Sequence, residues 1–173
     1  IVQIFEEYPY VDMFVFDVEI LNDDREISNY REIERLHRLR WYNSLRYGAC
    51  RFLIKKESLI KANVSFSHMF GGGTPYGSGE DSLFLMDCLR KKLRIYAYPL
   101  KIAFVNSQES SWYNGVDDKY FRDKGALYYN CFPIIYPMIY IVYAIRAKKK
   151  GFSFIRCLKL FYAGKKCWKI NRT

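Results

Sequence analysis

The clearest hydrophobic pattern is a strand-like segment near the start of the chain. Residues 11–20 place apolar side chains such as Met13 and Val15 opposite acidic ones, and the segment is rich in Val and Phe. Such alternation predicts a β-strand. The apolar run around Phe14–Phe16 predicts that its middle is buried on both faces, and Asn22 begins the polar segment that ends it.

The next segment has helical spacing. Ser28 can cap a helix that runs to about Leu45. The apolar residues near one side of it are Tyr30, Ile33, Leu36 and Trp41. Its arginines are Arg31, Arg35, Arg38, Arg40 and Arg46. We expect them to form a solvated face. The alternative is that one or two of them reach a phosphate group.

Shorter elements follow along the chain. Residues 49–54 are predicted to form a short strand, and 57–62 one or two helical turns. Residues 94–97 and 100–105 are predicted to form two short strands on either side of Pro99. A further helix is predicted to begin near Asp117 or Asp118.

A glycine-rich loop delivers two adjacent carboxylates to the start of a helix. Five glycines occur within residues 71–79, followed by Glu80 and Asp81 and then by an apolar stretch ending in Arg90. Acidic residues at the start and basic residues at the end suit the helix dipole, so a helix is predicted here. The glycines permit close backbone approach and predict a flexible loop.

Two roles for the carboxylates stay open. Ser78 and Asp81 have the spacing of a capping box, in which Ser78 caps the helix and Asp81 answers its amide. A helix N-terminus also keeps a carboxylate ionised, so that it can accept a proton. The sequence therefore predicts either a cap or a general base, and the two roles are compatible.

The last part of the chain combines apolar and basic residues. Residues 131–143 are mostly apolar but number only 13, whereas a membrane-spanning helix needs about 20, so no such span is predicted. Residues 144–173 hold ten Lys and Arg and no acid. Positions 154, 158 and 161 would give that segment one apolar helical face, which predicts a helix lying on an anionic membrane surface. The alternatives are a basic helix packed on the domain and a tail with no partner.

Charge and composition indicate where the net charge lies, whether the chain can form a core and in what state its cysteines are. The whole net charge of +10 lies in residues 144–173, because residues 1–143 hold equal numbers of acidic and basic side chains. With 50% hydrophobic residues the chain can form a core. The five cysteines contain no CxxC pair and are predicted to be buried free thiols in a reducing compartment.

Two stretches together resemble a known family. FGGGTPYGSGEDSLFLMDCLRKKLRIYAYP, from Phe70, and QESSWYNGVDDKYFRDKG, from Gln108, are similar to the C-terminal half of bacterial family 2 glycosyltransferases over about residues 10–145. The resemblance implies an α/β fold of the GT-A (Rossmann-like) type, here partial, with C-terminal basic amphipathic helices. We divide the chain into residues 1–130, the acceptor-side part, and residues 131–173, a membrane-associating tail.

The resemblance also implies roles for particular residues. It makes Asp81, with Glu80 beside it, the general base that deprotonates an acceptor hydroxyl. The residues expected to bind the acceptor are Gly71, Gly72, Gly73, Glu109, Trp112 and Tyr113. Packing is the alternative for Trp112 and Tyr113, and capping of a turn the alternative for Glu109. His68 is a candidate contact for diphosphate or metal, with an ordinary hydrogen-bonded histidine as the alternative.

The family's metal-binding DxD motif is not found in these residues, so we expect the metal and nucleotide sites in a segment before Ile1. The expected function is inverting sugar transfer from a nucleotide-sugar donor to a saccharide or lipid-linked acceptor, in bacterial surface polysaccharide synthesis. Mg²⁺ or Mn²⁺ is the expected cofactor, and the fragment alone is expected to be inactive. We expect the protein on the cytoplasmic face of the plasma membrane, without nucleic acid as a partner. The alternatives are a non-catalytic basic module that binds membrane or nucleic acid and a degenerate scaffold.

Overall fold

The computed structural model describes residues 1–21, 32–106 and 116–171. The chain forms two compact units: residues 1–66 with 84–110, and residues 67–83 with 111–173. Within the described residues the fold is mixed α/β, with a four-stranded sheet and six α-helices, the last three of which pack together. Residues 131–173 thus lie in the same unit as the glycine-rich loop. The functional division at residue 130 stays a prediction.

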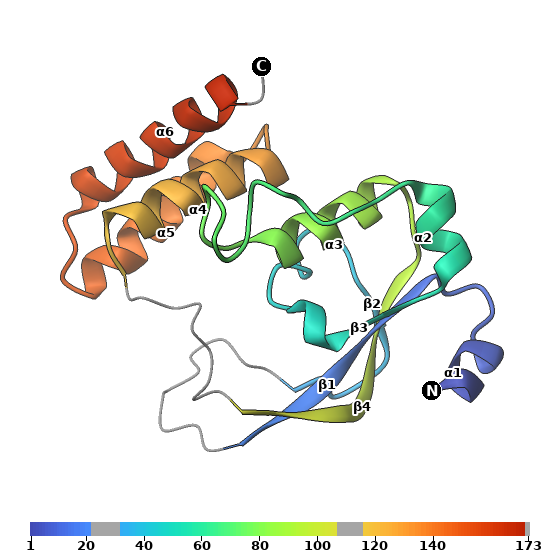
Figure 1. Cartoon of the computed structure of the whole chain (residues 1–173). Helices are drawn as coiled ribbons and strands as arrows, with labels where there is room; N and C mark the ends of the chain where they lie inside the picture. The colour runs from blue at the N-terminus through green and yellow to red at the C-terminus, as the bar shows by residue number, and fades with distance from the viewer. Residues whose placement is uncertain (22–31, 107–115, 172–173) are drawn as a thin grey trace. The chain divides into compact units, whose positions relative to one another are not determined.

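The first unit is built on the sheet, whose strand order is β2-β4-β1-β3. Strands β1 (Met13–Leu21) and β4 (Ile95–Asn106) run parallel at its centre (Figure 1). Strands β2 (His37–Arg38) and β3 (Phe52–Ile54) pair antiparallel at the two edges. Helices α1 (Val2–Glu7) and α2 (Lys56–Ala62) and the 3₁₀ turn η1 (Ala49–Arg51) complete the unit with the end of α3 (Glu80–Arg90).

The central strand is buried on both faces, as its sequence predicts. Successive side chains of a strand point to opposite faces. Met13 and Val15 join one core cluster, which includes Leu85 of α3. Phe14 and Phe16 join a second cluster on the other face. All four side chains are fully buried.

The helix predicted for residues 28–45 is wrong in its described part. Residues 32–45 contain β2 and turns instead, while residues 28–31 lie outside the described residues. The backbone N–H of Leu39 donates to the carbonyl of Ile95 at 2.8 Å, and Ile33 packs in the core of the sheet. Pairing with β4 therefore overrides the helical spacing. The arginines at positions 35, 38, 40 and 46 are exposed, as expected of a solvated face.

The two short strands predicted around Pro99 are one strand, β4. The register along β1 shifts there: Val15 pairs with Ala97, whereas Asp17 pairs with Lys101. The irregularity accommodates Pro99, which has no N–H to donate to a ladder. The strand predicted for residues 49–54 is confined to β3, because residues 49–51 form η1.

Two aspartates, one in β1 and one directly before it, hold the first unit together. Asp17 is buried and pairs with the guanidinium of Arg51, and it accepts the backbone N–H of Ile33 at 2.6 Å. Asp12 accepts the backbone N–H of Arg94 at 2.7 Å and the hydroxyl of Ser58 at 2.8 Å. Burial raises the pKa of Asp12, but these hydrogen bonds outweigh it, and the pKa is lowered. Both carboxylates have structural roles.

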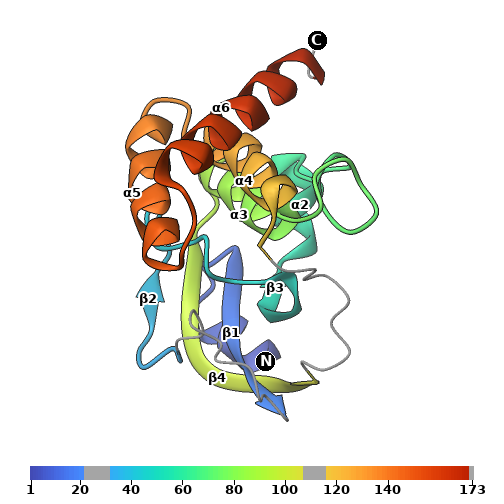
Figure 2. The same ribbon diagram turned by 90° about the vertical axis from the view of Figure 1, so that its left-hand side faces the viewer.

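The second unit contains α4 (Asp118–Cys131), α5 (Tyr136–Lys149) and α6 (Phe154–Asn171), which pack together (Figure 2). Asp117 caps α4 by accepting the backbone N–H of Tyr120 at 2.7 Å, so the predicted helix start is confirmed. Among the helices of the described residues, none combines the length and hydrophobicity needed to span a bilayer. The absence of a spanning segment at residues 131–143 was predicted. None of the five cysteines forms a disulfide, and three of them are buried, but the predicted burial is wrong for Cys50 and Cys167, which are exposed.

Helices α4 and α6 cross in close contact because of two glycines. A Cβ atom added at Gly164 would lie 1.8 Å from the carbonyl oxygen of Arg122. One added at Gly125 would lie 2.2 Å from the carbonyl oxygen of Phe161. The hydroxyl of Tyr140, on α5, donates to the carbonyl of Gly125 at 2.6 Å and joins the third helix to the crossing.

Gly164→Ala is therefore expected to destabilise the second unit, although alanine is the better helix former by about 1 kcal/mol. The added methyl meets backbone rather than a mobile side chain, so the helices must separate. We expect the free energy of unfolding to fall by about 2 kcal/mol, measured by urea unfolding. Lys166→Ala, at an exposed position of the same helix, is the control and should change little. Stabilisation by Gly164→Ala would contradict the close crossing.

Candidate functional site

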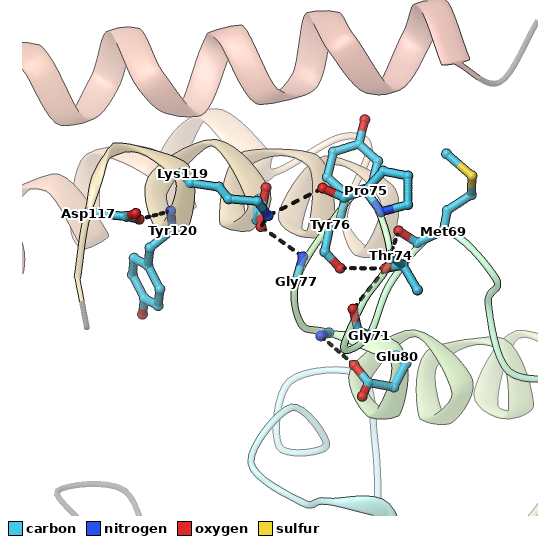
Figure 3. Close-up of polar contacts among 12 residues, drawn as sticks. Met69, Gly71, Thr74, Pro75, Tyr76, Gly77, Glu80, Asp117, Lys119 and Tyr120 are labelled. Carbon is cyan, nitrogen blue, oxygen red and sulfur yellow. Dashed lines mark hydrogen bonds and ion pairs between the residues drawn. The ribbon is translucent and has the colours of Figure 1, made fainter. Parts of the chain in front are cut away.

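The glycine-rich loop has a defined internal structure. The backbone N–H of Gly71 donates to the carbonyl of Tyr76 at 2.9 Å, and that of Tyr76 to the carbonyl of Met69 at 3.0 Å. The hydroxyl oxygen of Thr74 lies within hydrogen-bond distance of three carbonyl oxygens: those of Met69 at 3.0 Å, Gly71 at 2.8 Å and Tyr76 at 2.9 Å (Figure 3). The loop predicted to be flexible is thus folded around Thr74.

Side chains of helix α4 also hold the loop in place. Asp123 is buried and accepts the backbone N–H of Gly77 at 2.9 Å and the ammonium of Lys119 at 2.5 Å. Lys119 also donates to the carbonyl of Pro75 at 3.3 Å (Figure 3). We call Asp123 and Lys119, with these contacts to the loop, the clamp. The sequence did not predict it. The i, i+4 spacing of Lys119 and Asp123 could have predicted their ion pair, but not the loop that they hold.

The acidic pair begins helix α3, as predicted. Glu80 folds back on the loop, and one of its carboxylate oxygens accepts the backbone N–H of Gly79 at 2.9 Å. Gly71, at φ +126°, leaves room for this carboxylate: a Cβ there would lie 3.3 Å from Cδ of Glu80. Glycine at position 71 is therefore favoured by the backbone conformation, and a side chain there would also press on the carboxylate of Glu80.

The cap differs from the predicted one. Gly79, rather than Ser78, directly precedes α3, and its φ of +119° is a conformation that favours glycine. Asp81 is the second residue of α3 and is half-buried. At this position the helix N-terminus favours a negative charge. Glu80 is the carboxylate turned toward the loop, and the general-base role of Asp81 stays a prediction.

A half-buried cation lies near Glu80. The ammonium of Lys124 is 5.7 Å from the ring centroid of Tyr120. Burial lowers the pKa of Lys124, although its neighbours Cys131, Asp123 and Glu80 act in the opposite direction. A poorly solvated positive charge gains from a bound anion. Sequence analysis did not single out this residue.

An aromatic cluster joins the loop to the basic C-terminal helix. The rings of Phe70 and Tyr76 stack with centroids 4.6 Å apart. Trp168, on α6, packs against both, at 5.1 Å from Phe70 and 5.6 Å from Tyr76. The C-terminal segment therefore supports the loop as part of its fold, as the alternative of a basic helix packed on the domain predicts.

The remaining predicted site residues are placed as follows. Gly72, Gly73 and His68 are exposed. Glu109, Trp112 and Tyr113 lie outside the described residues, so their roles stay predictions. Within the described ranges, no group of three or more His, Cys, Asp or Glu side chains could hold a metal ion.

The second unit also contains an open cavity of about 670 Å³ beside the start of α4 and the turn between α5 and α6. An ion pair at 2.8 Å joins two residues of its lining, Asp118 and Arg156. Lys119 also lines the cavity and binds the loop at Pro75. The cavity thus borders the clamp that holds the loop.

Searches against protein-family models, curated proteins and solved structures found no significant match. The candidate site is therefore defined by its own residues: a folded glycine-rich loop, two carboxylates at a helix start and a half-buried cation nearby.

Proposed function

We propose that this chain is the acceptor-side part of an inverting glycosyltransferase of family 2 type, with a partial GT-A fold. The observation that carries the proposal is the placement of Glu80 and Asp81 at the start of α3, on a loop held by Asp123 and Lys119. A general base must stand on a rigid support, within reach of the proton that it removes. The family resemblance of the loop and of the residues after Gln108 supports the same function.

In this proposal Asp81 is the base and Glu80 keeps the loop in place. The acceptor hydroxyl gives its proton to the Asp81 carboxylate as its oxygen bonds to the anomeric carbon of the donor sugar. The bond from that carbon to the nucleoside diphosphate breaks, and the diphosphate leaves with the electron pair. One base on the acceptor side implies a single displacement, which inverts the anomeric configuration.

The resemblance also implies a divalent cation, Mg²⁺ or Mn²⁺, which would offset the charge of the leaving diphosphate. The described residues offer no ligand set for it, so we derive no step through it. We propose that the nucleotide-sugar and its metal bind to a segment outside these 173 residues. The poorly solvated cation of Lys124 is suited to a negatively charged substrate group near the acidic pair.

We further propose that the acceptor is a saccharide or lipid-linked saccharide of a bacterial surface polysaccharide. The enzyme would then act on the cytoplasmic face of the plasma membrane, as a peripheral protein. The basic character of residues 144–173 supports this placement, because anionic lipids attract such segments.

The test is sugar transfer by a protein that joins this chain to its donor-binding segment. The assay follows movement of a radiolabelled sugar from nucleotide-sugar donors to a membrane-derived acceptor fraction. Transfer that depends on Mg²⁺ or Mn²⁺ is expected. Binding of oligonucleotides in preference to anionic vesicles, without transfer, would instead support the non-catalytic basic module.

A further inference from the structure

The structure changes which helix face can meet a membrane. The residues predicted to face lipid were those at positions 154, 158 and 161 of α6. Phe161 is only 1% exposed, and its ring stacks on that of Tyr140 with centroids 5.0 Å apart. Phe154 and Leu158 are half-buried. This face of α6 therefore packs within the second unit.

Helix α5 exposes an aliphatic face instead. Met138 is 69% exposed, Ile141 46%, Val142 47% and Ile145 47%. Their spacing of three and four residues places them along one side of the helix. We call these four residues the α5 outer face. On the other side of α5, Tyr140 and Ala144 are fully buried. The helix is thus apolar on both sides, with one of them uncovered.

Basic residues continue the same face. Lys148 and Lys149 follow Ile145 by three and four residues and are exposed. Lys150 and Arg146, beside them, are exposed as well. No acidic residue follows Asp123 in the sequence, so neither α5 nor α6 carries a carboxylate that could offset this charge.

We infer that the α5 outer face docks on an anionic lipid bilayer, with α5 lying in the plane of the interface. Its aliphatic side chains would enter the boundary between headgroups and acyl chains, while Lys148 and Lys149 remain at the anionic headgroups. This specifies the surface behind the peripheral placement proposed above, and it does not depend on sugar transfer.

Other occupants fit these features less well. A nucleic acid would match the cations, but it offers no apolar surface for exposed Met, Ile and Val side chains. A second copy would cover the apolar residues but would bring two strongly basic surfaces together, and like charges repel. A bilayer with anionic lipids matches both the apolar and the basic residues.

The test is vesicle co-sedimentation of this chain. Wild-type protein is expected to bind vesicles that contain phosphatidylserine and phosphatidylcholine more strongly than vesicles of phosphatidylcholine alone. The double variant Ile141→Glu/Ile145→Glu is expected to bind the anionic vesicles at least about tenfold more weakly. It replaces apolar contacts by negative charges, which the anionic lipids repel. Circular dichroism checks that the helices remain folded.

The matched control is Ile155→Glu/Ile170→Glu on α6, where the replaced side chains are 65% and 62% exposed. It adds the same charge and should retain most of the binding. A second variant, Lys148→Gln/Lys149→Gln, should weaken binding to anionic vesicles only, and less so at high salt.

Three results would overturn the inference. One is equal loss of binding in the α5 and α6 double variants. Another is unchanged binding in the α5 double variant. The third is a dimer of the wild-type chain in sedimentation velocity that the α5 double variant dissociates, since that would assign the α5 outer face to a second copy. A failure here leaves the transfer assay unaffected, so the two proposals are tested separately.

Discussion

Asp81→Asn is expected to lower sugar transfer by about 10²–10⁴-fold, the usual contribution of a general base. The amide has the shape of the carboxylate but cannot take the proton of the acceptor hydroxyl. Asp81 lies at the start of α3, where the change from acid to amide leaves the helix intact. The measurement is the rate of transfer by a protein that carries this chain and its donor-binding segment, with binding of the nucleotide-sugar followed separately and expected to persist.

Two other variants of α3 calibrate that result. Asp87→Asn removes an exposed carboxylate that pairs with Arg90, and should leave transfer near the wild-type rate. Glu80→Gln should lower transfer less than Asp81→Asn, because an amide oxygen can still accept the N–H of Gly79. Near-normal transfer by Asp81→Asn would refute the assignment of the base.

The second large effect is expected in the first unit, at the buried ion pair of Asp17 and Arg51. Both residues are almost fully buried, at 3% and 5% exposure. Asp17→Asn removes the buried carboxylate that pairs with the guanidinium of Arg51, and breaking a buried ion pair costs about 3–5 kcal/mol. Arg51 keeps its hydrogen bond to the carbonyl of Phe16, at 2.6 Å, and its position 4.8 Å from the ring of Tyr47. The expected result is a fall of about that size in the free energy of unfolding, measured in urea.

The matched control is Lys101→Gln, which breaks exposed ion pairs with Glu19 and Glu32. Exposed pairs contribute about 0–1 kcal/mol, so the control should change stability little. If Asp17→Asn were as mild as Lys101→Gln, the ion pair would not hold the sheet as described.

The sequence predicted those elements that their own residues determine. The alternation in residues 11–20 gave β1, and the acidic start of α3 gave that helix. The helix predicted from Ser28 failed because the backbone of Leu39 pairs with β4, a contact distant in sequence. Hydrogen bonding between distant strands leaves no local signal, so spacing alone could not reveal β2.

In the candidate site, too, some features could be predicted from neighbouring residues and others could not. The position of Glu80 and Asp81 at a loop–helix junction could be predicted from neighbouring residues alone. The buried side chains that hold the loop, Asp123 and Trp168, come from α4 and α6 and could not be read from the loop sequence. The sequence also predicted an apolar face on α6. Tertiary packing, which the sequence did not reveal, buries Phe161 of that face.

The most direct test of the central claim is the anomeric configuration of the first product of transfer, read by proton NMR before it can equilibrate. Deprotonation of the acceptor by Asp81 in a single displacement predicts a glycoside whose configuration is inverted relative to the nucleotide-sugar donor. A glycoside with retained configuration, or release of the nucleoside diphosphate without any glycoside, would contradict it.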